Sequence, residues 1–171
     1  MNKFITTILI IISLVIIGAS CALADYAAGL KAYQQRDYGT AARLLKDDHS
    51  ADSAYLLGII YFKGEGVRAN KAEAIRWLRR AGEMGHVRAQ NNLGMIYDKG
   101  DGVHQDQKEA ASWYLKAAEK GDAQSQFDLG LMYTNGEGVA KDRKEAVKWL
   151  RKAAKQGHVN ARKLLKVMGE K

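Results

Sequence analysis

The sequence of 171 residues contains no proline and a single cysteine, Cys21. Without proline, no residue lacks the backbone N–H that a helix interior needs, so glycine and capping residues have to set the helix ends. Cys21 lies in an N-terminal segment that we expect to be removed, and a mature chain without cysteine has no disulfide bond. The fold is therefore expected to depend on side-chain packing alone.

The N-terminal segment has the three parts of a secretory signal peptide. Lys3 gives a positive flank, an apolar run covers residues 4–17, and Ala22 and Ala24 form an A-x-A cleavage site. We expect residues 1–24 to be a signal peptide that is cleaved after Ala24. The protein would then be exported, either periplasmic or secreted, with no integral membrane segment after cleavage.

Two other interpretations of this segment stay open. One is an uncleaved membrane anchor, although such anchors need about 20 apolar residues. The other is a lipoprotein signal at Cys21. Signals of that kind normally have an aliphatic residue three places before the cysteine, where this chain has Gly18.

The formal net charge is +8, which raises the question of an anionic partner. A basic chain suits nucleic acid, an anionic membrane surface or an acidic protein. The Lys and Arg residues form no dense run, and export makes nucleic acid an unexpected partner. We expect no nucleic acid to bind; a solvated surface explains the charge most simply, and a membrane-surface protein stays open as an alternative.

The chain repeats itself at intervals of 36 residues. The segments KGEGV, KGDGV and NGEGV begin at Lys63, Lys99 and Asn135, and the register extends well beyond these loops. The matching positions of the first unit are Leu57, Gly58, Tyr61, Glu73, Ala74, Trp77, Ala81 and Gly85, and each recurs twice. Three units in register, without insertion, indicate one structure built from stacked repeats.

Each unit is predicted to form two helices, at about residues 51–62 and 71–84 in the first unit, because small and apolar residues recur there at helical spacing. The second helices would begin after an N-cap at Asn70, Asp106 or Asp142, with a glutamate three residues on as the partner in a capping box. Glycines suited to a left-handed backbone follow these helices. They are Gly85, Gly121 and Gly157.

The first helices have N-caps of unequal quality. The register places Ser50, His86, Asp122 and His158 at this position. Ser and Asp are good caps, whereas His is a poor one, so weaker helix starts are expected at residues 87 and 159.

The glycine loops and the recurring aromatic residues both have a structural explanation. A phosphate-binding loop usually has a lysine after its glycines. These loops lack it, and Glu65, Asp101 and Glu137 would repel phosphate. Trp and Tyr at constant helical spacing are typical of a core rather than of a ligand cage.

The flanks of the array are partial copies of the unit. Residues 26–48 have the pattern of a helix pair joined by a tight turn, and residues 160–171 that of one basic helix; both suit the ends of a repeat stack. The predicted domains are a signal peptide (1–24), an N-terminal helix pair (25–49), three repeats within 50–159 (about 50–85, 86–121 and 122–157) and a C-terminal capping helix (158–171).

The repeated unit resembles the Sel1-like repeat, a relative of the tetratricopeptide repeat, and residues 26–48 resemble the shorter tetratricopeptide-like pair. The family often has proline after the loop, where this chain has Arg68, His104 or Ala140. The resemblance implies an all-α, right-handed superhelix of antiparallel helix pairs that binds proteins or peptides and serves as an adaptor.

The same resemblance implies that the first helix of each pair lines the inner face. Positions on that face differ between units, whereas the packing positions repeat, which is typical of a ligand groove; tolerance of surface substitutions stays open as the alternative. The predicted partner-binding residues are Tyr55, Ile59, Phe62, Asn91, Met95, Asp98, Phe127, Leu131 and Thr134.

No pattern in the sequence predicts catalysis, a cofactor or a metal site. The four histidines, His49, His86, His104 and His158, form no H-x-x-H pair, and no serine or cysteine nucleophile motif is present. We expect an exported, non-catalytic scaffold whose partner is a protein or peptide. The alternative is an envelope-associated enzyme, or a protein that interacts with glycan or β-lactam.

Overall fold

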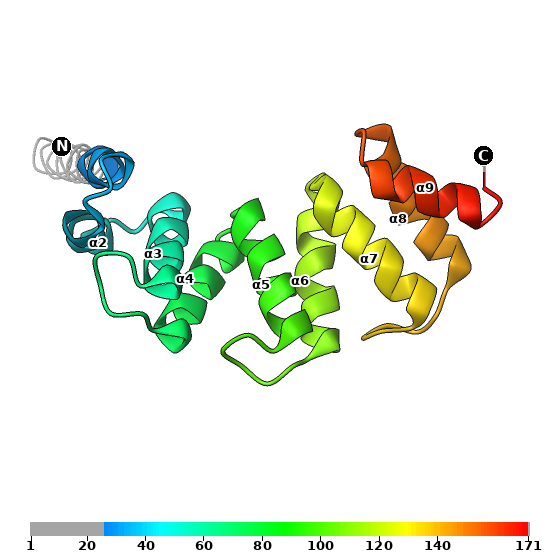
Figure 1. The fold of residues 1–171 in the computed structure, drawn as a ribbon, viewed down its shortest axis with the longest axis horizontal. Coiled ribbons are helices and arrows are strands. Elements are labelled where there is room, and N and C mark those ends of the chain that lie inside the picture. The colour runs from blue at the N-terminus through cyan, green and yellow to red at the C-terminus, as the bar shows by residue number, and fades with distance from the viewer. Residues whose placement is uncertain (1–25, 171) are drawn as a thin grey trace, which may run out of the picture.

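A computed structural model describes residues 26–170, and the expected signal peptide lies outside these residues. The described chain is all α-helical, with consecutive helices stacked side by side and α2 and α9 at opposite ends of the long axis (Figure 1). Residues 26–34 form the first helix of the described part. The others are α2 (Tyr38–Asp47), α3 (Ala51–Lys63), α4 (Lys71–Glu83), α5 (Val87–Lys99), α6 (Gln107–Glu119), α7 (Ala123–Asn135), α8 (Arg143–Lys155) and α9 (Val159–Val167).

The predicted N-caps of α4, α6 and α8 are confirmed, but the capping box is not. Asn70 accepts a hydrogen bond from the Glu73 N–H at 3.1 Å. The return bond from the Asn70 N–H to Glu73, which a capping box requires, does not form. That N–H donates instead to the Tyr61 carbonyl at 2.9 Å, which closes the preceding loop onto the end of α3.

The glycines that follow the second helices take the left-handed conformation predicted for them. Gly85 has φ 91°. The His86 N–H donates to the Ala81 carbonyl at 2.9 Å, and the Gly85 N–H donates to Gly82 at 3.0 Å. This pair of bonds is a Schellman motif, which satisfies the last carbonyls of α4 and turns the chain into α5.

Within each repeat, the two helices cross at a glycine. A Cβ atom built on Gly58 of α3 would lie 2.6 Å from Cγ of Leu78 on α4. The same relationship joins Gly130 to Leu150 at 2.8 Å. A side chain larger than hydrogen at these glycines would therefore collide with the leucine of the paired helix.

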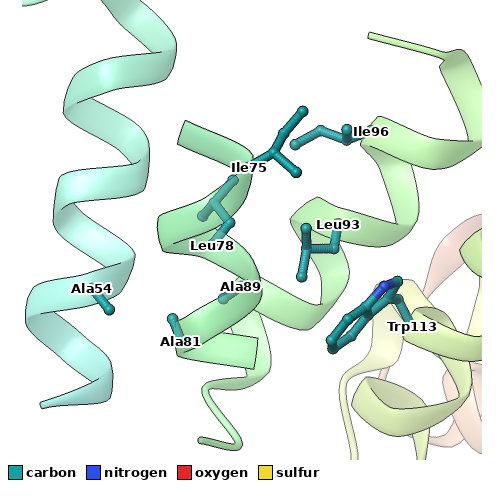
Figure 2. Close-up of a cluster of buried hydrophobic side chains, with 8 residues drawn as sticks. All are labelled: Ala54, Ile75, Leu78, Ala81, Ala89, Leu93, Ile96 and Trp113. Carbon is teal, nitrogen blue, oxygen red and sulfur yellow. The ribbon is translucent and has the colours of Figure 1, made fainter. Parts of the chain in front are cut away.

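The core continues from one repeat into the next. Figure 2 shows one buried cluster with side chains from α3, α4, α5 and α6. Its members are Ala54, Ile75, Leu78, Ala81, Ala89, Leu93, Ile96 and Trp113. Trp113 is 2% exposed, so the first repeat uses a side chain of the second to complete its core, and Trp149 joins the core of the second repeat in the same way.

The C-terminal end of the array replaces the ion pairs that a further repeat would form. Arg79 of α4 pairs with Glu109 of the next repeat, at 3.2 Å. The equivalent residue of α8 is Arg151, which pairs with Glu170 at 2.8 Å, and Arg143 pairs with the same carboxylate at 3.2 Å. α9 ends at Val167, earlier than predicted, because Gly169 takes a positive φ of 75°.

Within residues 26–170, no helix is both long and apolar enough to cross a membrane.

Candidate functional site

The predicted partner-binding residues all lie on α3, α5 and α7, the first helices of the three repeats. We call the surface formed by these helices the first-helix face. All nine side chains are half-buried, so each is packed against the protein and is also accessible. Which of the nine bind a partner stays a prediction. Leu131 is half-buried on α7, and the surroundings of the other eight divide them into three groups.

The first group lines an apolar groove between α3 and α5. Ile59, Phe62 and Met95 form its walls, together with the buried side chains of Leu78 and Ile96. The groove has a volume of about 240 Å³, and its other lining residues are Asn92, Lys99 and Asp101.

Two charged residues lie beside the Phe62 wall of this groove. The Lys71 ammonium lies 5.6 Å from the centre of the Phe62 ring and also forms an ion pair with Asp101. A cation over the face of an aromatic ring is attracted by the electrons of that ring. Lys71 therefore lies between Phe62 and Asp101, two residues that line the groove.

The second group contacts the N-cap of the next first helix. The Tyr55 ring is stacked on the His86 imidazole with 4.3 Å between ring centroids, and Phe127 is stacked on His158 at 4.4 Å. In the middle repeat, Asn91 replaces the aromatic residue. Its amide donates to the Asp122 carboxylate at 3.4 Å and to a neighbouring serine hydroxyl.

These contacts explain part of the sequence variation that predicted a groove. An aromatic residue occurs where the cap 31 positions later is histidine, and asparagine occurs where that cap is aspartate. The histidines do serve as caps: Nδ1 of His86 accepts from the Ala89 N–H at 3.1 Å. Burial lowers the pKa of His86, in opposition to Asp52, and so favours the neutral imidazole that this bond requires.

The third group has a more polar environment, between α5 and α7. The Thr134 hydroxyl donates a hydrogen bond to the Gly130 carbonyl of its own helix at 2.8 Å, so this hydroxyl already has a partner. Asp98 lies near Asp128, a residue that the sequence analysis did not select. Burial raises the pKa of Asp128 to about 6; Asp98 also raises it, while a hydrogen bond from Gln124 acts in the opposite direction.

Positive charge is concentrated on the second helices. α4, α6 and α8 carry twelve basic and five acidic residues. α3, α5 and α7 carry only three of each. The first-helix face therefore has no excess of positive charge of its own, although the whole chain is strongly basic.

Sequence reasoning missed Tyr114 and Asp128, which lie beside the predicted Asp98. Tyr114 belongs to a second helix, at the position where the other repeats have Leu78 and Leu150. The signal that could have revealed it is a polar residue at a leucine position of the repeat.

The described residues contain no group of three or more His, Cys, Asp or Glu side chains placed to hold a metal ion. The features that the first-helix face offers a ligand are an apolar groove, hydrogen-bonding groups and two neighbouring carboxylates. Such a surface is suited to non-covalent recognition.

Comparisons with known proteins identify the repeat. The sequence profile of the Sel1 repeat matches residues 51–86, 87–122 and 123–158. A Sel1 repeat protein from Oxalobacter formigenes is 35% identical with a TM-score of 0.78, over 86% of this chain and 45% of that one. A protective antigen of uropathogenic Escherichia coli with an SLR fold is 34% identical with a TM-score of 0.77, over 82% of this chain and 32% of that one.

A third solved structure, cysteine-rich protein B of Helicobacter pylori, is 28% identical with a TM-score of 0.58, over 80% of this chain and 94% of that one. Among curated proteins, no match was found. The chain spans less than half the length of the Oxalobacter and Escherichia proteins.

Proposed function

The chain belongs to the Sel1 repeat family, and we propose that it is an exported, non-catalytic scaffold that binds an extended segment of a partner protein on its first-helix face. Sel1 repeat proteins are typically scaffolds for protein interactions, and this chain consists largely of such repeats. The observation that carries the proposal is the apolar groove formed by Ile59, Phe62 and Met95.

The groove suits a side chain of a polypeptide better than a free small molecule. Its volume of about 240 Å³ lies below the roughly 300–1,000 Å³ that is usual for small-molecule sites. Phe62 is partly accessible, and aromatic residues are frequent among the few side chains that dominate binding energy. An apolar side chain of the partner would enter the groove while the backbone of the partner follows the surface.

The proposal is tested by selecting peptides from a random displayed library on the purified chain. We expect the selected peptides to share an apolar residue, and the Phe62→Ala and Met95→Ala variants to bind them at least about tenfold more weakly, as for interface hot spots. Matched controls are Lys108→Ala and Lys155→Ala on α6 and α8, two exposed residues on second helices. These controls should bind like the wild type, and thermal melts should show that every variant is folded.

Two results would contradict the proposal. One is a set of selected peptides that bind the groove variants as tightly as the wild type. The other is catalysis: turnover of peptidoglycan or of a chromogenic β-lactam, abolished by a single polar substitution, would favour the enzyme alternative. Liposome binding that disappears at high salt would favour the membrane-surface alternative.

Export is part of the proposal and rests on residues 1–24. Expression in a Gram-negative host, followed by mass spectrometry of the periplasmic fraction, should find a chain that begins at Asp25. Ala24→Lys should leave the signal uncleaved. A wild-type chain that stays in the cytoplasm with its N-terminus intact would contradict export.

A further inference from the structure

A second cavity, of about 550 Å³, lies along α8 and outside the first-helix face. Its walls carry more positive than negative charge. Four of its lining residues are basic, Arg143, Lys144, Lys148 and Arg151, and two are acidic, Glu145 and Glu170. A cavity with such an excess of positive charge attracts an anion.

The two arginines of this cavity, Arg143 and Arg151, stand at positions that bind carboxylates in the first repeat. The equivalent residues there are Lys71 and Arg79, on α4. Each of these pairs with a carboxylate of the second repeat. The carboxylates are Asp101 and Glu109. The position is therefore one at which the chain already binds carboxylates of a polypeptide.

Stacking of the repeats does not require a basic pair at these positions. The second repeat has Gln107 and Leu115 there, and Trp149 of the third repeat still packs into its core. The arginines of the third repeat are therefore explained by the group that they bind.

A single carboxylate, that of Glu170, now occupies both arginines. Arg143 lies 3.2 Å from one oxygen of Glu170, and Arg151 lies 2.8 Å from the other. The two arginine side chains are 65% and 49% exposed, and ion pairs at such exposed positions add little to stability. Glu170 can therefore be replaced at low cost by another carboxylate.

The third repeat also contains a buried donor whose usual acceptor is taken by the cavity. In the second repeat, the Trp113 indole N–H donates to Glu109 at 3.0 Å. The equivalent Glu145 instead accepts from Lys148 at 2.9 and 2.8 Å, and the buried indole N–H of Trp149 has no partner among residues 26–170. Since buried polar groups are nearly always hydrogen-bonded, an anion that takes over Lys148 would release Glu145 to Trp149.

From this arrangement we infer that the cavity along α8 binds the carboxylates of an acidic polypeptide segment, and that Glu170 is an internal ligand which this segment displaces. Guanidinium groups bind carboxylates through several N–H donors, and each arginine uses only one nitrogen toward Glu170. The inference goes beyond the proposed function, because the cavity includes no residue of the first-helix face.

A pair of labelled octapeptides tests the site by fluorescence polarisation at low salt. One has four glutamates in a Gly/Ser background, and the other has glutamines in their place. The variants are Arg143→Gln/Arg151→Gln, which removes the proposed donors, and Glu170→Gln, which removes the internal ligand.

Each variant has a control that changes the net charge equally at exposed residues outside the cavity. The control for the arginine pair is Lys108→Gln/Lys155→Gln, and the control for Glu170→Gln is Glu119→Gln. Thermal melts check that every variant is folded.

The wild type should bind the glutamate peptide at least about tenfold more tightly than the glutamine peptide, the size of one charge-assisted bond. The arginine variant should lose this preference, and the lysine control should keep it. Glu170→Gln should bind the glutamate peptide about two- to fivefold more tightly than the wild type, because a weak competitor is gone. A misfolded variant would not give this gain, and Glu119→Gln should bind like the wild type.

The indole N–H signal of Trp149 in isotope-labelled protein, assigned with Trp149→Phe, locates the bound peptide. It should shift as the glutamate peptide is added. An unchanged signal at saturation, equal binding of the two peptides, or an equal loss in the lysine control would overturn the inference. So would a Glu170→Gln variant that binds like the wild type. Phe62→Ala should leave binding of the glutamate peptide unchanged; a loss there would place the peptide in the apolar groove and overturn the second site, without contradicting the proposed function.

Discussion

The imidazole of His86 is stacked on the ring of Tyr55, with 4.3 Å between centroids and an angle of 19° between the ring planes. The same side chain caps α5 through Nδ1. One residue thus links two repeats and starts a helix, and the Phe127–His158 pair repeats this arrangement at the end of the array.

This relationship predicts that the pair can be transplanted into the middle repeat. Asn91→Phe alone should destabilise the protein, because it removes the bonds to Ser125 and Asp122. Combined with Asp122→His, it should recover part of the loss. Urea unfolding of the two single variants and the double variant should give a favourable coupling of about 0.5–1.5 kcal/mol, as for aromatic pairs. Additive effects would show that stacking does not link the repeats.

The His86 cap also predicts a pH dependence. The folded state lowers the pKa of His86, so unfolding takes up a proton once the pH falls below the ordinary value of 6.5. The free energy of unfolding contributed by His86 is therefore present at neutral pH and is lost as the pH falls. His86→Ser keeps a cap that does not titrate, so its unfolding free energy should fall less than that of the wild type between pH 7 and pH 5. A parallel decline in both proteins would contradict the prediction.

Asp128 should have the opposite effect. Its folded pKa of about 6 lies above the ordinary 3.8, so the ionised group destabilises the fold fully above pH 6, and the penalty disappears as the pH falls toward 4. Asp128→Asn should stabilise the protein at pH 7 by about 1–2 kcal/mol, since one unit of pKa corresponds to about 1.4 kcal/mol and solvent reduces the effect. The gain should shrink at pH 4. A variant that is less stable than wild type at pH 7 would show that the carboxylate supports the fold.

Two Gly→Ala substitutions should have opposite effects on stability, because only one of the two glycines lies at a close crossing of helices. Gly94→Ala should destabilise by about 1–3 kcal/mol, because its methyl group would collide with the Tyr114 ring. Gly39→Ala in α2 should be neutral or stabilising by up to about 1 kcal/mol, because the nearest atom to its Cβ is 3.4 Å away and alanine favours a helix. Thermal unfolding of both variants measures the difference. Equal effects would mean that packing at Gly94 is not tight.

Two tryptophans at the same position of the repeat, Trp113 and Trp77, should differ in their contributions to stability. Trp113 is 2% exposed between two repeats, whereas Trp77 is half-buried. Trp113→Ala should cost about 3–5 kcal/mol, as for other buried tryptophans, and Trp77→Ala should cost less. Urea titration would detect this order, and a reversed order would contradict the packing described for the core.

Much of the fold could be predicted because the repeat has a strict period. Helices expected at residues 51–62 and 71–84 are observed as α3 (Ala51–Lys63) and α4 (Lys71–Glu83). The capping box was wrong because the Asn70 N–H donates to the Tyr61 carbonyl, which the loop brings near, and is no longer free for Glu73. A tertiary contact of this kind leaves no local signal.

Less of the candidate site could be predicted. Comparing variable positions on the first helices selected Ile59, Phe62 and Met95, which do line one groove. It also selected Tyr55 and Phe127, whose variation follows the caps that they contact. Asp128 and Tyr114 were missed because they come from different helices, and no sequence spacing shows that these helices place them side by side.

Binding of partner segments to the first-helix face can be mapped residue by residue. Isotope-labelled protein is titrated with the tightest selected peptide, and backbone amide chemical shifts are recorded. We predict that the shifted amides lie on α3, α5 and α7, with the largest changes near Phe62, Met95 and Asp98. Changes concentrated on α4, α6 and α8, with the first helices unaffected, would contradict the account.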